Sequence, residues 1–247
     1  VNLAGISKAD SSCDMDMLEY CVRDDLKLKK ARIMAVLHPL KLIIDNYPEG
    51  QSEEIEIPNN LEVPEMGERS VSFSRELWIE QEDFMEEPPH KYFRLFPGNE
   101  VRLMGAYLVR CTGCDKDENG NVICVHAEYD PATRGGNAPD GRKVKGTIHW
   151  VDAKTAYKAT VRLYESLIDT EKGMFDESGA LNLNPNSLTV LTDCYMEPML
   201  RDAKPYDSFQ FVRNGYFTVD SHDSKDGEPV FNRIVGLKSS FKLPKAE

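Results

Sequence analysis

Four possible metal ligands lie close together in the middle of the chain. Cys111 and Cys114 form a Cys-x-x-Cys pair, and Cys124 and His126 follow after a short interval. The intervening Asn119-Gly120 pair is typical of a tight turn between antiparallel strands. A hairpin would bring the four side chains towards one another, and three sulfurs with one imidazole form a known zinc ligand set. Because strand cysteines are commonly small buried residues, structural thiols without a metal are the favoured interpretation.

A second group of residue types suits the recognition of single-stranded RNA. Residues 90–95 mix basic with aromatic side chains, and Gln210 and Arg213 lie beside Phe209 and Phe211. Aromatic rings stack on unpaired bases, while guanidinium and amide groups form hydrogen bonds with base edges. The same residue types alternate in any amphipathic strand, so composition alone gives only a weak indication of an RNA site.

The signature motifs of common catalytic and nucleotide-binding sites are missing from the sequence. Residues 136–143 approach a phosphate-binding loop, but Arg142 stands where that motif has lysine and no Ser or Thr follows. The five histidines are scattered along the chain, so proximity builds no Ser/His/Asp or Cys/His arrangement. The residues therefore indicate neither a nucleotide site nor an active site.

Composition places the chain among soluble globular proteins with reduced cysteines. The 247 residues include 30 Lys and Arg against 42 Asp and Glu, for a net charge of −12, and six cysteines. The cysteines are too sparse for a disulfide framework, and no apolar run approaches the roughly 18–20 residues of a membrane helix. We therefore expect free thiols, no membrane association and a cytoplasmic location. The chain starts at Val1 and not at Met, so we expect it to be part of something longer.

Charge is unevenly distributed along the chain. Residues 51–87 hold twelve acidic residues against Arg69 and Arg75, whereas residues 134–158 hold six basic residues against Asp140 and Asp152. We expect one positive face on an otherwise acidic protein.

The elements that must position these side chains are one helix followed by many strands. Residues 11–14 fit a helix capping box, and Leu18, Cys21, Val22 and Leu26 then recur at helical spacing. From Arg32 onward, short β-branched and apolar runs alternate with turn residues every 8–12 residues or so. This pattern predicts a mainly β chain built from antiparallel barrels or sandwiches.

Longer segments carry a resemblance to a known family. Residues 64–69, 73–79 and 83–84, then 140–150 and 229–237, with shorter matches at 210–211, 215–217 and 220–221, resemble glutaminyl-tRNA synthetases in the same order along nearly the whole chain. That family consists of class I aminoacyl-tRNA synthetases, which activate glutamine with ATP and Mg²⁺ and transfer it to tRNA(Gln). The two motifs of its catalytic domain are absent here. The resemblance therefore implies an anticodon-binding part that is inactive alone, holds no cofactor and acts with the catalytic domain of a parent enzyme.

The resemblance also implies a domain organisation. Residues 1–30 would end a helical connector, residues 31–90 with 196–247 would form a proximal barrel, and residues 91–195 a distal barrel. Both would be antiparallel β-barrels of the anticodon-binding type, like that of a ribosomal protein. We expect the parent enzyme to be a monomer.

Candidate contacts with the anticodon loop follow from the same resemblance. Arg32 matches the family's arginine at the middle uridine, and Gln210 matches its glutamine partner. Arg94 matches the arginine that reads the third base, a guanine, because a guanidinium fits two acceptors on the edge of guanine. Arg102 matches a contact near the first base, and Arg213 an arginine close to the anticodon. Lys91 joins the candidates, although it stands in place of a glutamine.

The sequence leaves two alternatives open. The first is the corresponding pair of barrels in a glutamyl-tRNA synthetase, which residues 140–150 and 229–237 disfavour. The second is a non-enzymatic barrel module that binds structured RNA.

Overall fold

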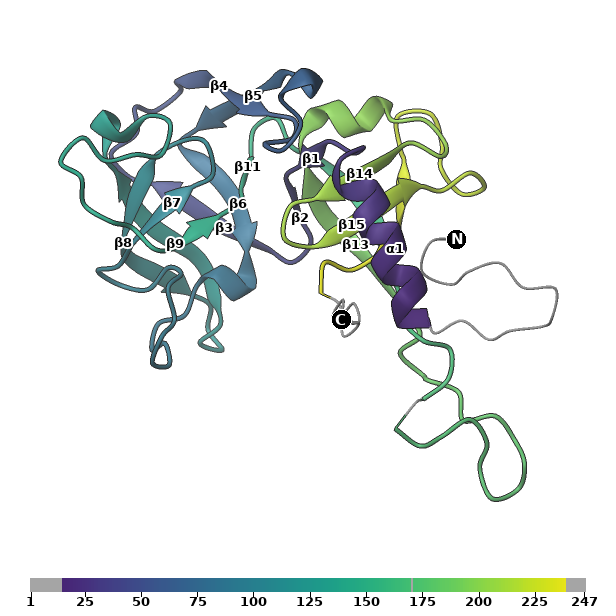
Figure 1. The fold of residues 1–247 in the computed structure, drawn as a ribbon. Coiled ribbons are helices and arrows are strands. Elements are labelled where there is room, and N and C mark those ends of the chain that lie inside the picture. The colour runs from purple at the N-terminus through teal and green to yellow at the C-terminus, as the bar shows by residue number, and fades with distance from the viewer. Residues whose placement is uncertain (1–14, 170, 239–247) are drawn as a thin grey trace, which may run out of the picture.

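The computed structural model describes residues 15–169 and 171–238 and shows two barrel-like sheets that follow one helix (Figure 1). This arrangement confirms the predicted mainly β fold with two barrels and a short preceding helical segment. None of the helices in the described residues is long and apolar enough to cross a membrane.

The single α-helix of the described residues, α1 (Met15–Lys27), confirms the helix predicted from apolar spacing. Lys27 lies in its last turn, where a cation complements the negative end of the helix dipole. The side-chain amide of Asn60 donates hydrogen bonds to the carbonyl oxygens of Lys27 and Lys30, at 2.9 and 3.2 Å. The end of α1 is thereby fixed to the loop that contains Asn60, while the predicted capping box at residues 11–14 lies outside the described residues.

The first sheet takes up the middle of the chain and has the strand order β10-β7-β8-β9-β3-β6-β11. Its strands are β3 (Pro39–Ile44), β6 (Glu76–Glu80), β7 (Glu100–Leu103), β8 (Leu108–Lys116), β9 (Val122–Tyr129), β10 (Thr147–Ile148) and β11 (Val151–Asp152). A separate hairpin of β4 (Ser52–Pro58) and β5 (Glu68–Ser74) lies beside it. We call this unit the 39–152 barrel.

The second sheet has the strand order β1-β14-β15-β16-β12-β13-β2, and we call it the 157–235 barrel. Its strands are β1 (Arg32–Ile33), β2 (Ala35–Val36), β12 (Tyr157–Tyr164), β13 (Leu188–Met196), β14 (Ser208–Phe211), β15 (Gly215–Val219) and β16 (Val230–Val235). The first two strands precede the whole 39–152 barrel in sequence. The 39–152 barrel is therefore inserted between strands of the second sheet.

Strand pairing divides the chain differently from the units expected at 31–90 with 196–247 and at 91–195. β3, from the first expected unit, pairs with β9 of the second, and β12 of the second pairs with β16 of the first. Both pairs are parallel and join strands far apart in sequence, so no hairpin turn signals them. The assignment of one unit as proximal and the other as distal to a catalytic domain stays a prediction.

Each barrel has an aromatic core of its own. In the 39–152 barrel, Phe73 meets Trp150 edge to face, with ring centroids 5.1 Å apart. In the 157–235 barrel, Phe211 stacks on Phe217 at 4.3 Å and meets Phe231 edge to face. These positions alternate with outward-facing residues, as in β3, so period-two patterning places one face of each strand in the core.

Buried charge pairs join the two barrels. Arg69 of β5 bonds Glu197, directly after β13, through Nε and Nη2 at 2.6 Å each. Arg213, in the turn between β14 and β15, bonds both carboxylate oxygens of Asp83 at 2.7 Å. The carboxylate of Glu80 also accepts backbone hydrogen bonds from Leu37 and His38. These paired and hydrogen-bonded charges fix the two barrels at their contact.

Candidate functional site

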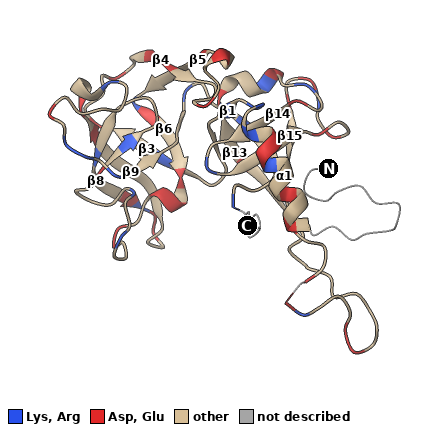
Figure 2. Cartoon of the chain, in the orientation of Figure 1, with Lys and Arg blue, Asp and Glu red and all other residues tan. Residues whose placement is uncertain are grey.

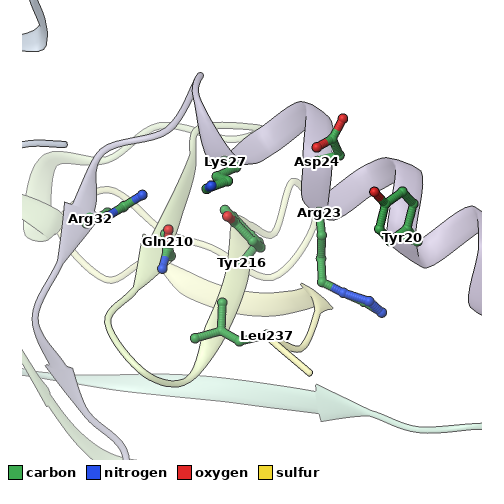
Figure 3. Close-up of a pocket in the computed structure, with 8 residues that line it drawn as sticks. All are labelled: Tyr20, Arg23, Asp24, Lys27, Arg32, Gln210, Tyr216 and Leu237. Carbon is green, nitrogen blue, oxygen red and sulfur yellow. The ribbon is translucent and has the colours of Figure 1, made fainter. Parts of the chain in front are cut away.

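A surface pocket of about 390 Å³ lies where α1 crosses the 157–235 barrel (Figure 3). Side chains from α1, β1, β14, β15 and the segment after β16 form its wall, namely Tyr20, Arg23, Asp24, Lys27, Arg32, Gln210, Tyr216 and Leu237. Its lining is rich in guanidinium, ammonium, amide and phenol groups, which suits a polar ligand better than an apolar one.

Arg32 and Gln210 are neighbours in this pocket because their strands are paired. β1 lies parallel to β14 with Arg32 opposite Gln210, and the backbone N–H of Gln210 donates to the carbonyl oxygen of Ala31 at 2.9 Å. The next residues of both strands, Ile33 and Phe211, point into the core. Alternation along the strands therefore turns Arg32 and Gln210 outwards, towards the pocket.

Two polar atoms of this pair have no partner. Nε of Arg32 and Oε1 of Gln210 are buried, and neither forms a hydrogen bond within the described part of the chain. Buried polar groups are normally satisfied, and leaving one unpaired costs about 1–3 kcal/mol. One donor and one acceptor, on residues opposite each other in the sheet, thus lack partners, as expected for a site that a ligand completes.

A carboxylate from the other barrel reaches the same place. Glu62, in the loop between β4 and β5, accepts a hydrogen bond from Nη2 of Arg32 and lies 2.7 Å from Nζ of Lys27. The hydrogen bond from Lys27, followed by that from Arg32, lowers the pKa of Glu62, and the same contact raises the pKa of Lys27. Glu62 is therefore charged at neutral pH and bridges two cations.

The predicted contacts Arg94 and Arg213 lie together at a second site between the barrels. Nη1 of Arg94 bonds the Glu82 carboxylate at 2.9 Å, and its Nε lies 3.4 Å from the Asp83 carboxylate. Arg213 bonds that same Asp83, which is fully buried. More than a third of the Arg94 side chain stays exposed, so its outer edge is accessible to a ligand.

Arg213 has a structural role that the sequence did not reveal. Its φ is +66°, a conformation that costs a non-glycine residue energy, and its guanidinium is engaged by Asp83 and Glu82. Because carboxylates hold its guanidinium, Arg213 joins the two barrels and, through the shared Asp83, helps to orient Arg94. This structural role leaves it few donors for a ligand.

The predicted contacts Arg102 and Lys91 lie apart from the first pocket. Nε of Arg102 donates to the carbonyl oxygen of Gly136, and its Nη1 bonds Thr147 at 3.3 Å, so Arg102 anchors the loop after β9. Lys91 is exposed in a turn at φ +68°. Nearby, Nζ of Lys145 lies 4.8 Å above the half-exposed ring of Phe93, which adds a cation and an aromatic face to this side of the molecule.

The expected positive face at residues 134–158 is partly neutralised by nearby carboxylates. Arg142 bonds the carboxylates of Glu100, Asp130 and Asp140, and Arg134 bonds Glu53. Figure 2 shows acidic and basic residues distributed over both barrels. Local acids therefore pair with both arginines of this segment.

The possible zinc ligands are not brought together. Cys111 and Cys124 are buried, and burial raises the pKa of each thiol to about 11, which disfavours the thiolate that zinc binds. Both ring nitrogens of His126 are bonded instead, at 3.0 Å to Asp45 and 3.1 Å to Asp115. Among residues 15–169 and 171–238, no three His, Cys, Asp or Glu side chains form a group able to hold a metal ion.

Sequence reasoning missed several residues of the first pocket. Lys27 lies at the end of the predicted helix, only five residues before Arg32. That short separation in sequence indicates that the two side chains lie close together. Tyr216 reaches the pocket, and Glu62 reaches its residues Lys27 and Arg32, through contacts between segments far apart in sequence; burial raises the pKa of Tyr216. No local pattern marks either residue.

The geometry is that of two β-barrels with a guanidinium–amide pocket, and the comparisons with known proteins identify the class to which they belong. Residues 31–130 and residues 147–220 match two family models, each described as an anticodon-binding domain of class I tRNA synthetases (E and Q). The chain belongs to the anticodon-binding domains of this synthetase family.

Its curated relatives bear one particular name. Glutamine–tRNA ligases of Clostridium kluyveri and Clostridium perfringens are 54% and 55% identical over 242 and 244 residues, each alignment covering 97% of this chain and 43% of the relative. That of Cupriavidus necator is 57% identical over 242 residues, which cover 96% of this chain and 41% of the relative. The chain thus spans less than half the length of these relatives. Their names favour the glutaminyl resemblance over the glutamyl alternative and over a non-enzymatic barrel.

Proposed function

We propose that this chain binds the anticodon loop of tRNA(Gln) as part of a parent glutamine–tRNA ligase, which joins glutamine to that tRNA with ATP and Mg²⁺. The observation that carries the proposal is the pair of buried, unpartnered atoms in the first pocket, Nε of Arg32 and Oε1 of Gln210. ATP and Mg²⁺ would act at the catalytic domain of the parent enzyme.

The pair suits the edge of a uracil. Uracil presents the N3–H donor between two carbonyl acceptors, and a glutamine amide can accept from the donor while it donates to one carbonyl. Arg32 supplies the donor for the other carbonyl. A cytosine reverses part of this pattern and would leave buried groups unpaired, which is the basis of discrimination. We therefore assign the middle anticodon base to Arg32 and Gln210.

Arg94 would read the third base. Its guanidinium is partly exposed, and Glu82 and Asp83 engage Nη1 and Nε, so Nη2 is left to donate to the acceptor edge of guanine. Arg213 would act through Asp83 as a positioning residue. Arg102 and Lys91 would lie near the first base, where Arg102 also holds the loop that contains Gly136.

The test is binding of anticodon stem-loops to the purified chain. Arg32→Ala and Gln210→Ala should each cost on the order of 10-fold in affinity for the cognate loop and should reduce the preference for uridine at the middle position. Lys158→Ala, a matched loss of an exposed cation on β12, should leave the base preference unchanged. If both pocket variants keep the parent preference at the middle base, the pocket does not read that base.

We propose that the parent enzyme works as a monomer in the cytoplasm. The described cysteines, which are Cys21, Cys111, Cys114, Cys124 and Cys194, are all free thiols, as proteins of reducing compartments usually have. Sedimentation of the purified parent enzyme would test the monomer, and a mass at twice the expected value would overturn it.

A further inference from the structure

Glu62 occupies the cationic groups of the pocket before any ligand arrives. Its carboxylate bridges Nη2 of Arg32 and Nζ of Lys27, so one acidic side chain engages two of the cations in the pocket wall. We call this arrangement the Glu62 bridge. It joins the 39–152 barrel, which supplies Glu62, to α1 and β1.

The position of Glu62 is set by its backbone. Its N–H donates to Oδ1 of Asn60 at 3.0 Å, and the buried Asn60 amide in turn donates to the carbonyl oxygens of Lys27, the last residue of α1, and Lys30. The carbonyl oxygen of Asn59 also accepts from the N–H of Arg32 at 2.7 Å. The loop is therefore tied to both elements that carry the cations, so the bridge is built into the fold.

The Glu62 bridge occupies the cationic groups that would bind a phosphate, and it leaves unbonded the atoms that could pair with a base. Adjacent Lys and Arg side chains bind nucleic-acid phosphates irrespective of sequence, which is the main source of non-specific affinity. The charged heads of Lys27 and Arg32 are both engaged by Glu62, whereas Nε of Arg32 and Oε1 of Gln210 remain without partners. A neutral base edge can pair with these atoms, but a phosphate has no donor for Gln210.

We infer that Glu62 is a specificity-determining residue: its carboxylate excludes phosphates from the Arg32–Lys27 pair and so reserves the pocket for a base. This inference rests on the proposed function, because it assumes that the pocket receives a base of an RNA loop. An acidic residue would thus contribute to RNA recognition by preventing phosphates from binding in the pocket.

The experiment compares Glu62→Gln with the parent chain against two probes across a salt series. One probe is a ten-nucleotide oligoadenylate, and the other is the glutamine anticodon stem-loop with each base at the middle position. Glu62→Gln should bind the oligoadenylate on the order of 5-fold more tightly at ~50 mM salt, with a salt slope steeper by about 0.7 for each cation freed. It should also discriminate less between middle bases.

Two further variants serve as controls. Glu65→Gln removes the same charge from an exposed residue of the same loop and should behave like the parent chain. Glu62→Asp keeps the charge and should restore the parent salt slope. Thermal unfolding of all variants shows whether any difference arises from loss of fold.

The outcomes separate the two proposals. An oligoadenylate affinity and slope unchanged or lowered in Glu62→Gln, with a parent chain that still prefers uridine, would overturn the role of Glu62 alone. A parent chain with no preference at the middle base would overturn base reading at this pocket, whatever the slope. If Glu62→Gln binds the oligoadenylate more tightly and with a steeper salt dependence, and discriminates less between middle bases, both proposals are supported.

Discussion

Arg213 and Asp83 form a two-point ion pair across the junction of the two barrels, with both hydrogen bonds at 2.7 Å. Asp83 is fully buried, and its carboxylate also lies 3.4 Å from Nε of Arg94. One buried carboxylate thus serves both the contact between barrels and the orientation of the proposed guanine reader. Stability and third-base recognition should therefore be linked through this residue.

The first prediction concerns this link. Arg213→Ala should lower the free energy of unfolding by about 2–3 kcal/mol, because it leaves the buried Asp83 charge with fewer partners. It should also weaken discrimination at the third anticodon base, since Arg94 then becomes the main partner of Asp83. Urea unfolding and stem-loop binding measure the two effects. A variant that loses stability but keeps full third-base discrimination would show that Arg94 is positioned independently.

The second prediction concerns Arg69 and Glu197, whose side chains are 9% and 2% exposed. Arg69→Met should destabilise the chain by about 3–5 kcal/mol, because Glu197 would keep a buried charge with its hydrogen bond from the Met34 backbone as a remaining partner. Replacing both residues, as Arg69→Met with Glu197→Gln, should recover part of the loss. Equilibrium unfolding in urea is the measurement, and a change below ~1 kcal/mol for the single variant would contradict a buried clamp.

The third prediction is a pH dependence at His126. Hydrogen bonds with Asp45, and then with Asp115, raise the pKa of His126 above its usual 6.5. A group whose pKa is raised on folding contributes stability that is fully present below its unfolded pKa and is lost as the pH rises through the folded pKa. The parent chain should therefore exceed His126→Gln in stability at pH 6, and the difference should shrink as the pH is raised towards 9. A pH-independent difference would mean that the ring acts in its neutral form.

The fourth prediction tests a close backbone approach near Lys145. A Cβ added at Gly146 would lie 1.9 Å from the carbonyl oxygen of Phe93, so Gly146→Ala should destabilise the chain by more than ~1 kcal/mol and displace the segment around Phe93. Gly113→Ala is the matched control, because a Cβ there meets no atom within 4 Å. Thermal unfolding of the two variants gives the comparison, and equal melting temperatures would refute the close contact.

Local patterns in the sequence predict the helix and strands of this fold better than they predict which strands pair with each other. The helix around Leu18 and the hairpin around Asn119-Gly120 follow from apolar spacing and turn chemistry, and both are present. The parallel pairing of β3 with β9 depends on packing between segments far apart in the chain, which no local signal encodes. For this reason the expected division of the chain into units differs from the observed sheets.

The candidate site shows the same division. Arg32 and Gln210 are indicated by family resemblance, and the register of β1 with β14 brings them together. Glu62 belongs to a run of acidic residues in which nothing distinguishes it, and its two cationic partners become visible in three dimensions. Counting charges along residues 134–158 likewise overstates the positive face, because Arg142 is enclosed by carboxylates.

The insertion of the 39–152 barrel between strands of the other sheet sets an order of assembly during synthesis. The inserted barrel can close once Asp152 has left the ribosome, because all of its strands are then available. β2 ends at Val36 but pairs with β13, which begins at Leu188. At ~5–20 residues per second, those early strands wait roughly 8–30 s for their partners. The barrel that carries Arg32 and Gln210 is therefore completed last, around a neighbour that has already folded.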